Sequence, residues 1–305
     1  MKIVIVGAGG MGCKFGAMLA KAAEVWLVHH NEEHVAAIRE RGLIVGRNGK
    51  QEVVRVNAAV KPVEAGFADL VIILVKSYDT EAAVEAAIPI LREDTLVLTM
   101  QNGLGNLEKI SEMVGAQRAA LGVTFHGATL TGIGRVEDKG AGPTYLACTD
   151  STEERMKQVA EAFNRAGIKT ELVANLESVL WAKLCVTAGI NPVAAILRVP
   201  NGVLDAIPEA RDLSLAAIGE AMDIARRKGI SLAFDPVERF HAVAKATASM
   251  CSGTLLDAIR GRRTEIDAIS GGLVAEAKRL GMSAPVHQML WGIVKAVEAT
   301  HKFRI

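Results

Sequence analysis

The chain opens with MKIVIVGAGGMG, residues Met1–Gly12, and this stretch decides the fold. An apolar run of β-formers, 3–6, leads directly into the pattern Gly-x-Gly-x-x-Gly, and a helix-like segment, 10–21, follows it. The glycines alone are a weak sign, but at a strand-to-helix junction they specifically indicate dinucleotide binding. We therefore expect a nucleotide-binding turn between the first strand and the first helix.

The glycines of this turn have separate expected roles. Gly7 allows the tight turn, Gly9 lets a pyrophosphate approach the backbone, and Gly12 lets the helix pack closely on the strand. The helix N-terminus supplies free N–H groups and a positive dipole end to the phosphates. The plainer alternative is an ordinary glycine-rich turn, which the position at the N-terminus disfavours. The expected cofactor-binding residues of the turn are Gly7, Ala8, Gly9, Gly10, Met11 and Gly12.

Composition limits the function classes. A length of 305 residues suggests about two domains, and half of the residues are hydrophobic. The net charge is +1 and the basic residues are scattered, so we expect no nucleic-acid partner. No uninterrupted apolar stretch reaches the ~18 residues of a membrane span, and no signal peptide precedes the first strand. The chain is therefore predicted to be a soluble cytoplasmic protein.

The four cysteines are Cys13, Cys148, Cys185 and Cys251, and they form no Cys-x-x-Cys pair. Such wide spacing favours reduced thiols over a disulfide framework, and it predicts no metal site.

Strand and helix signals alternate through the first half of the chain. The predicted strands are 3–6, 24–29, 70–75, 95–99 and 121–124, and the predicted helices are 10–21, 32–41 and 81–91. This order predicts an α/β fold with a Rossmann-type doubly wound parallel sheet. Asn48-Gly49 indicates a hairpin insertion over 43–56, and alternating β-formers and glycines over 127–146 indicate a small antiparallel addition to the sheet.

Long helical patterns dominate the second half. They cover 176–197, 209–228, 235–250, 264–280 and 285–300. Gly229 and Gly281 stand where helix C-caps are expected. We predict a dinucleotide-binding domain over 1–174 and an all-α substrate and dimerisation domain over 175–305.

Two polar residues follow predicted strands at the carboxyl edge of the sheet, where ligands bind in open α/β folds. Asn102 lies in Gln101-Asn102-Gly103, and Lys76 ends an apolar run. Asn102 can bind a substrate oxygen or the cofactor amide, and Lys76 can meet a ribose, a phosphate or a substrate anion. The alternatives are a simple Asn-Gly turn and a solvated lysine.

Two further segments carry ionisable groups. Lys183, Thr187 and Asn191 are four residues apart and share one face of a predicted helix. Glu265 lies in a charged segment, Arg262–Asp267. Taken alone, Lys183 is predicted to extend its ammonium group to the surface from an apolar face. Taken alone, the charged segment is predicted to be the start of a helix capped by Thr264.

Together these segments resemble the ketopantoate reductase family, and the resemblance covers essentially the whole chain. The matching segments are GAGGMG at 7–12, VKSYDT at 75–80, MQNGLGN at 100–106, WAKL at 181–184, INP at 190–192, PNG at 200–202 and RRTEID at 262–267. Their joint order and spacing is specific, whereas no single segment except the first is. The resemblance implies an NAD(P)H-dependent reductase of a 2-oxo acid, with a dimer through the helical domain as a possible assembly.

The resemblance also implies site residues. Lys183 matches the catalytic lysine, and Glu265 the glutamate that faces the lysine and the substrate hydroxyl. Asn102 and Asn191 match the substrate-site asparagines, and Lys76 the strand-end lysine near cofactor and substrate. Protonated Lys183 would stabilise the developing oxyanion and donate a proton to it.

The chain departs from the family pattern at the substrate site. Thr187 stands where a second helix asparagine is usual, and keeps a hydroxyl but no amide. Gly253 replaces a serine expected to bind the substrate carboxylate, with Ser252 and Thr254 as the possible replacements. These differences weaken the case for ketopantoate itself.

A third departure concerns the cofactor. The second strand ends in His29-His30-Asn31, and His30 aligns with the usual arginine. An NAD enzyme often has Asp or Glu here and an NADP enzyme Arg, while a histidine is a poor fixed cation near neutral pH. The expectation of NADP, with NAD as the alternative, therefore comes from the family.

Three hypotheses follow. The first is a 2-dehydropantoate 2-reductase, and the second keeps the fold but takes another branched 2-oxo acid or an opine-type imine. The third, a non-catalytic dinucleotide-binding protein, has no need for Lys183, Asn191 and Glu265.

Overall fold

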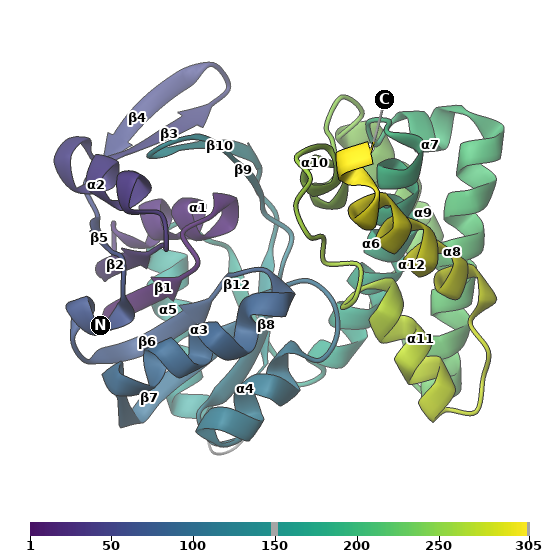
Figure 1. The fold of residues 1–305 in the computed structure, drawn as a ribbon. Coiled ribbons are helices and arrows are strands. Elements are labelled where there is room, and N and C mark those ends of the chain that lie inside the picture. The colour runs from purple at the N-terminus through teal and green to yellow at the C-terminus, as the bar shows by residue number, and fades with distance from the viewer. Residues whose placement is uncertain (148–151, 304–305) are drawn as a thin grey trace. The chain divides into compact units, whose positions relative to one another are not determined.

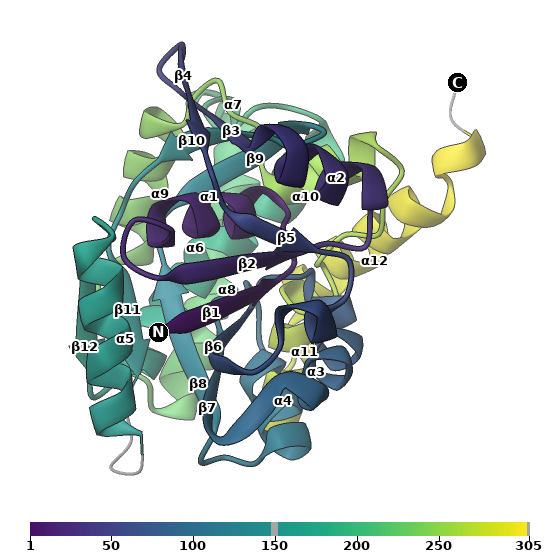
Figure 2. The same cartoon turned by 90° about the vertical axis from the view of Figure 1, so that its left-hand side faces the viewer.

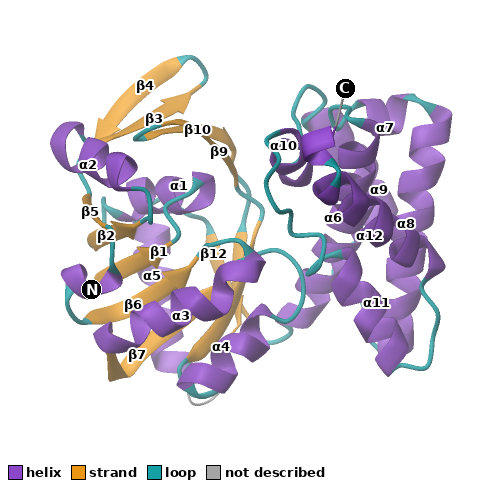
Figure 3. Cartoon of the chain, in the orientation of Figure 1, coloured by secondary structure: helices purple, strands orange, loops and turns teal. Residues whose placement is uncertain are grey.

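The computed structural model describes residues 1–147 and 152–303, so the predicted thiol Cys148 lies outside the described residues. The chain forms two compact units (Figure 1). Unit 1 comprises Met1–Gln101 and Asn106–Leu176, and unit 2 comprises Asn102–Gly105 and Glu177–Ile305. The described strands all belong to unit 1, and unit 2 is helical (Figure 3). The predicted fold class, a parallel α/β sheet followed by an all-α region, is confirmed.

The strands of unit 1 form two sheets. Their bounds are β1 Lys2–Val6, β2 Glu24–Val28, β3 Leu43–Arg47, β4 Lys50–Val54, β5 Asn57–Ala59, β6 Ala68–Ile73, β7 Leu91–Thr99, β8 Ala119–Thr124, β9 Gly127–Gly132, β10 Arg135–Gly140, β11 Thr144–Ala147 and β12 Thr170–Val173. The main sheet has the order β12-β11-β8-β7-β6-β1-β2-β5. The six neighbouring strands β5-β2-β1-β6-β7-β8 all pair in parallel. The direction in which the chain adds strands to the sheet reverses between β1 and β6 (Figure 2). Ligands bind at such a switch point, outside the carboxyl ends of the strands.

The helices are distributed over both units. Their bounds are α1 Gly10–Leu19, α2 Glu32–Arg41, α3 Thr80–Ala87, α4 Asn106–Val114, α5 Glu153–Arg165, α6 Leu176–Leu197, α7 Val203–Ala206, α8 Pro208–Lys228, α9 Pro236–Ala246, α10 Gly253–Ile259, α11 Ser270–Arg279 and α12 Pro285–Ala299. Short 3₁₀ turns occupy Pro62–Ala65, Ser77–Asp79, Ile88–Ile90 and His301–Phe303.

Alternating apolar residues give the main sheet two buried faces. On β1, Ile3 and Ile5 join the core that α1, α2 and α5 cover, whereas Val4 and Val6 join the core under α3 and α4. This is the expected result of period-two side-chain alternation in a strand covered on both sides. The continuous apolar runs seen in the sequence therefore belong to a sheet between two helical layers.

The predicted antiparallel addition to the main sheet is only partly right. Over 127–146, β9 and β10 form a hairpin that leaves the main sheet and pairs through β10 with β3. A separate sheet of order β4-β3-β10-β9 results, beside α1 in Figure 1. Only β11 joins the main sheet, antiparallel to β8. The predicted 43–56 hairpin is confirmed as β3 and β4, with Asn48 and Gly49 both at positive φ.

Three predicted helices have wrong bounds, and the one expected over 235–250 ends at Ala246. The helix expected over 81–91 ends at Ala87, because Pro89 lacks an N–H and its ring restricts the residue before it, and Leu91 already begins β7. The helix expected over 264–280 begins only at Ser270. Thr264, predicted as its cap, instead hydrogen-bonds Glu298 through both its N–H and its hydroxyl.

Unit 2 has its own hydrophobic core, which includes Trp181, Phe240 and Leu273. Its central helix α6 has the predicted bounds of 176–197. Among the described residues, α6 passes a membrane-span test based on length and composition, with a mean hydropathy of 1.5. Of that apolar window, 72% is buried in the fold, as in the core helix of a globular protein.

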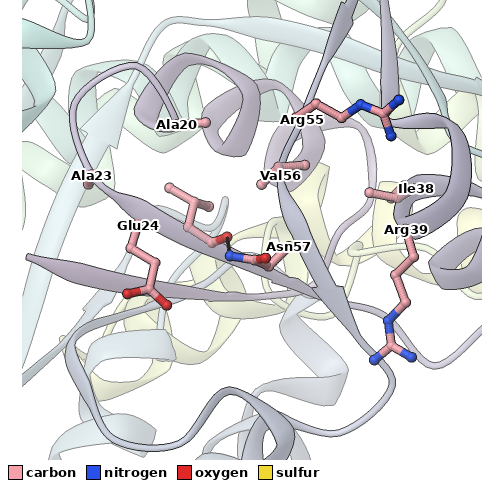
Figure 4. A pocket seen from close by; sticks show the side chains of 9 residues that line it. Ala20, Ala23, Glu24, Ile38, Arg39, Arg55, Val56 and Asn57 are labelled. Atoms are coloured by element: carbon pink, nitrogen blue, oxygen red, sulfur yellow. Dashed lines mark hydrogen bonds between the residues drawn. The ribbon is translucent and has the colours of Figure 1, made fainter.

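A shallow pocket of about 320 Å³ lies at the amino end of β2 (Figure 4). Glu24 and Val25 begin the strand here, and the Asn57 amide donates to the Val25 carbonyl at 3.3 Å. Parallel strands bind ligands at their carboxyl ends. This pocket therefore lies at the opposite edge of the sheet from the glycine-rich turn.

Candidate active site

The structure gives a steric reason for two of the three motif glycines of the glycine-rich turn, Gly7 and Gly12. Gly7 has φ +108°, and a Cβ there would collide with the backbone of Leu74 and Val75. A Cβ at Gly12 would collide with the Gly7 carbonyl oxygen, so helix α1 packs directly on the turn. At Gly9, by contrast, a Cβ would meet no atom within 4 Å. The open side of the turn is therefore at the glycine expected to face a pyrophosphate.

The N-terminus of α1 fits a bound anion. Its N-cap, Gly9, offers no side chain to the free N–H groups, and the first turn contains no acidic residue. Unpaired N–H groups and the positive end of a helix dipole attract phosphate. The residues present therefore fit the pyrophosphate of a dinucleotide, which Gly7, Ala8, Gly9, Gly10, Met11 and Gly12 would hold; the assignment of each as a contact stays a prediction.

Gly10 has a role that the sequence did not indicate. A Cβ there would lie 2.8 Å from the carbonyl oxygen of Ala128 and 3.2 Å from the N of Leu130. Strand β9 therefore lies directly on the first turn of α1. The absence of a side chain at Gly10 allows β9 to pack against α1, and this role is independent of the predicted contact with the cofactor.

The end of β2 carries a cluster of imidazoles. His30 is exposed and stacks on His29 with ring centroids 4.5 Å apart, and the His34 ring lies 4.8 Å from that of His29. The Asn31 side chain accepts the His34 N–H at 2.7 Å and so caps α2. Of the three residues singled out in the sequence, His30 is thus the exposed one beside the expected ribose site.

His34 was missed by the sequence analysis. It is buried, its Nδ1 accepts the Gly134 N–H at 3.1 Å, and its Nε2 lies 3.6 Å from Cys13 Sγ. Burial lowers the pKa of His34, so the neutral ring with its proton on Nε2 is favoured. The ring thereby links the β9–β10 turn to α1. His34 lies four residues before the apolar Ile38 on the same helix, and this helical spacing was the sequence signal that the ring is buried.

A buried hydrogen-bond network supports the carboxyl edge of β6 and β7. The Gln101 amide donates to the Val75 carbonyl at 2.8 Å and to Thr80 Oγ1 at 2.9 Å. Its oxygen accepts from Thr99 Oγ1 at 2.9 Å. Lys76, half-buried, directly follows Val75. Gln101 therefore fixes the backbone on which the predicted Lys76 stands.

His126 is a second residue that the sequence analysis missed. It follows β8, and neither of its buried ring nitrogens has a hydrogen-bond partner in the described structure. Burial, and then the charge of Lys14, lowers the pKa of His126 to about 4, so the ring is neutral at physiological pH. Buried polar atoms without partners are rare in proteins and often mark a functional position. No sequence periodicity singles out this residue.

Three predicted site residues come together in unit 2. Lys183 Nζ donates to Asn102 Oδ1 at 3.0 Å, and the Glu265 carboxylate is close enough to act on the lysine charge. Burial lowers the pKa of Lys183 to about 8, and the negative charge of Glu265 opposes that shift. An ammonium group that loses its proton near pH 8 is suited to proton donation near neutral pH.

Backbone contacts join the segment that follows Asn102 to the turn that follows Glu265. Gly103 has φ +85°, and a Cβ there would lie 2.6 Å from the Ala268 Cβ and carbonyl oxygen. The next residue, Leu104, donates its N–H to that same carbonyl at 2.9 Å. The segment after β7 is therefore fastened to the non-helical turn that contains Glu265. The Asn-Gly turn is not a simple turn, and the charged segment is not a helix start.

The other predicted substrate residues are Thr187, Asn191 and Ser252, and the hydrogen bonds of Thr187 and Ser252 are local to their own helices. Thr187 Oγ1 donates to the Lys183 carbonyl at 2.9 Å, so its hydroxyl proton is used within the helix. Asn191 is half-buried on the same helix, eight residues after Lys183. Ser252 Oγ accepts the Leu255 N–H at 3.2 Å as the N-cap of α10. Beyond it, Gly253 has no atom within 4 Å of a Cβ position.

The described residues contain no cluster of three or more His, Cys, Asp or Glu that could hold a metal ion. Cys13 and Cys185 are buried and free, and burial raises the pKa of each thiol to about 12. Neither buried thiol is therefore an activated nucleophile. The chemistry available is proton donation by an ammonium group whose carboxamide and carboxylate neighbours are fixed.

Comparison with known proteins gives a consistent result over the whole chain. Family models described as "Ketopantoate reductase PanE/ApbA" and its C-terminal part match residues 3–151 and 175–298. A 2-dehydropantoate 2-reductase of Pyrococcus horikoshii is 37% identical over 300 residues, which are 98% of each chain.

Solved structures agree with the sequence matches. A PanE/ApbA family ketopantoate reductase from Ralstonia eutropha JMP134 superposes with a TM-score of 0.90 at 32% identity, over 99% of this chain and 100% of that one. A D-mandelate dehydrogenase, solved with NADH and anilino(oxo)acetate, gives a TM-score of 0.93 at 28% identity, over 98% and 99%.

Proposed function

This chain belongs to the ketopantoate reductase PanE/ApbA family, and we propose that it reduces 2-dehydropantoate to (R)-pantoate with NAD(P)H, a step of pantothenate and coenzyme A biosynthesis. The enzyme is an oxidoreductase that acts on a CH–OH/C=O pair. The observation that carries the proposal is the Lys183 ammonium, with its pKa lowered to about 8 and bonded to Asn102.

The chain's own residues perform the proton chemistry. Lys183 Nζ, which Asn102 Oδ1 holds by a hydrogen bond, donates to the C2 carbonyl oxygen of the 2-oxo acid. It stabilises the developing negative charge and transfers a proton to that oxygen. Glu265 keeps the ammonium protonated more than burial alone would allow. Asn102 and Asn191 orient the substrate. A bound dinucleotide would supply the hydride from its nicotinamide, and the glycine-rich turn would hold its pyrophosphate.

We assign NADP(H) as the preferred cofactor, with NAD(H) as the alternative. The family resemblance supports NADP, and exposed His30 would meet the 2′-phosphate when protonated. A structural relative was solved with NADH, which supports the alternative. Since a neutral imidazole gives no charge to a phosphate, the preference is expected to be modest.

The decisive experiment is a ketopantoate reduction assay run in parallel with NADPH and NADH on the native chain and on Lys183→Ala. Loss of the general acid is expected to lower kcat by about 10²–10⁴-fold. The Kd for NADPH should stay unchanged, because α1 and its glycine turn are untouched. Undiminished turnover in Lys183→Ala would refute the assigned mechanism.

A bulkier 2-oxo acid is the second candidate substrate. The open space at Gly253, where the family usually has serine, and the similarity to a D-mandelate dehydrogenase both favour it. Specificity constants for ketopantoate, other branched 2-oxo acids and benzoylformate, measured with and without added amines, would separate the two candidates and the opine-type alternative. A kcat/KM for benzoylformate above that for ketopantoate would favour the second.

We further assign the protein to the cytoplasm, as a homodimer without a nucleic-acid or membrane partner. The wide cysteine spacing and scattered charge support the first assignment. The dimer is supported by family resemblance and by exposed apolar side chains of unit 2, namely Leu213 on α8 and Met289 and Ile293 on α12.

A further inference from the structure

Lys14 is a buried lysine that the proposed reaction does not use. It lies on α1, four residues after Gly10, and is 2% exposed. Its Nζ donates to Asp138 Oδ1 at 2.5 Å, to the Gly140 carbonyl at 2.6 Å and to the Gly127 carbonyl at 3.2 Å. An ammonium group has three protons, so these acceptors satisfy it completely. All three acceptors belong to the β9–β10 hairpin.

Lys14 and Asp138 form an ion pair within unit 1, and Arg47 lies 3.4 Å from the other Asp138 oxygen. Burial lowers the pKa of Lys14, and the hydrogen bond and charge of Asp138 oppose this. Burial by itself would raise the pKa of Asp138, but the bonds from Lys14 and the Gly140 N–H, with the charges of Lys14 and Arg47, hold it below its usual value. Lys14 and Asp138 thus form a close ion pair, and the side chain of each is largely buried. Such buried pairs are weak evidence for stability, and the best-attested reason to retain one is that it fixes an arrangement.

The hairpin that Lys14 holds lies on the cofactor turn. The Ala128 carbonyl faces the Cα of Gly10 so closely that a Cβ would be 2.8 Å away. Ala128 adjoins Gly127, whose carbonyl accepts from Lys14. At the other end of the hairpin, the His34 ring accepts the Gly134 N–H. Lys14 therefore bonds β9 at Gly127, one residue before Ala128, which contacts Gly10 in the first turn of α1.

We propose that Lys14 is a positioning residue for the cofactor: its ammonium group fastens β9 to α1 and thereby fixes the Gly7–Gly12 turn in its phosphate-binding form. The inference rests on the dinucleotide binding proposed above, but not on the substrate or the reaction. Lys14 has no proton or bond left for the cofactor itself, so its effect is exerted through the backbone of β9 and the turn.

Lys14→Met is expected to weaken cofactor binding without changing the chemical step. Displacing the N–H groups of the turn by even about 1 Å is enough to misplace a bound group, and we expect the Kd of both NADPH and NADH to rise at least about tenfold. The kcat at saturating cofactor should stay close to that of the native enzyme, because Lys183 and Asn102 are unchanged.

The test measures Kd by the fluorescence of bound NADPH and NADH, with melting temperature recorded for each variant. Lys139→Met is the matched control: it removes an exposed lysine from the same hairpin, next to Asp138. The double variant Lys14→Met/Asp138→Leu removes both buried charges, and such apolar replacement of a buried pair is often neutral or stabilising.

The proposal is supported if Lys14→Met raises both Kd values, Lys139→Met does not, and the double variant recovers the melting temperature while Kd stays raised. It is overturned if folded Lys14→Met binds both cofactors normally. It is also overturned if the double variant recovers Kd together with the melting temperature, because Lys14 then serves stability alone. Since fluorescence titration needs no substrate, failure to reduce any 2-oxo acid would count against the proposed function and leave this test intact.

Discussion

Lys183 shows how neighbours set the protonation of one side chain. Burial lowers the pKa of Lys183 and so favours the neutral amine, whereas the negative charge of Glu265 raises that pKa again in part. Reduction requires the protonated form. The rate of reduction is therefore expected to be highest below about pH 8, the pKa of Lys183, and to fall about tenfold per pH unit above it.

Glu265→Gln should change the pH above which the rate of reduction falls. Because the Glu265 charge raises the pKa of Lys183, its removal is expected to lower that pKa below about 8 and shift the alkaline limb of the kcat–pH profile to lower pH. Glu276→Gln is the matched control, since Glu276 pairs with Lys228 and Arg279 instead. An unshifted limb in Glu265→Gln would show that the carboxylate does not set the protonation of Lys183.

The strand–turn–helix element at the N-terminus was the best predicted part of the chain. β1 and the start of α1 agree with the sequence prediction because both depend on local periodicity and on glycines a few residues apart. The steric reasons at Gly7 and Gly12 also agree with the roles expected from the motif. The contact between Gly10 and β9 could not be foreseen, since it joins segments more than a hundred residues apart.

Two alanine substitutions should separate binding from packing in this element. At Gly9 a methyl group has open space in the protein, so Gly9→Ala should keep its melting temperature but raise the Kd for NADPH at least about tenfold by occupying the phosphate approach. At Gly12 the methyl group meets the Gly7 carbonyl, so Gly12→Ala should lose about 1–3 kcal/mol of stability. Equal melting-temperature losses in the two variants would contradict the assignment.

The turn before α11 shows where sequence reasoning fails at the level of elements. Its residues have a plausible capping threonine followed by acids, which is a regular helix-start signal. Thr264 instead bonds Glu298, and the Ala268 carbonyl accepts from Leu104. These partners lie 34 and 164 residues away in the chain, so no local window contains them. This non-helical turn also contains Glu265, whose charge acts on Lys183.

The assembly of the whole molecule is open to a direct test. Met289 and Ile293 are exposed apolar residues four apart on α12, and so lie on one face. If this face forms the homodimer, light scattering should give about twice the chain mass for the native protein and the chain mass for Met289→Glu/Ile293→Glu. Val63→Glu, at an exposed apolar position in unit 1, is the control. A double variant that remains dimeric would exclude α12 as the interface.

The two units differ in how far their sequences specify them. In unit 2, α6 and α8 follow the predicted bounds closely, because an apolar face repeats along each helix. In unit 1, the parallel strands β1, β2, β6, β7 and β8 were predicted, but β5, β12 and the distribution of strands between two sheets were not. The pairing of β10 with β3 joins residues about ninety apart, and hydrophobic alternation is the same whichever sheet a strand enters.

Local chemistry along the chain was enough to specify the glycine-rich turn, the alternation of strands and helices, and the residue types of the site, because each depends on neighbours within one turn or one strand. It did not reveal β5, α4, α5 or β12. The folded chain alone decided which of these residues act together. It brought Asn102 to Lys183, 81 residues away, tuned the lysine by burial against Glu265, and set Lys14 against Asp138. Burial and charge coupling arise only when distant segments exclude water from one another, and no sequence window contains that information.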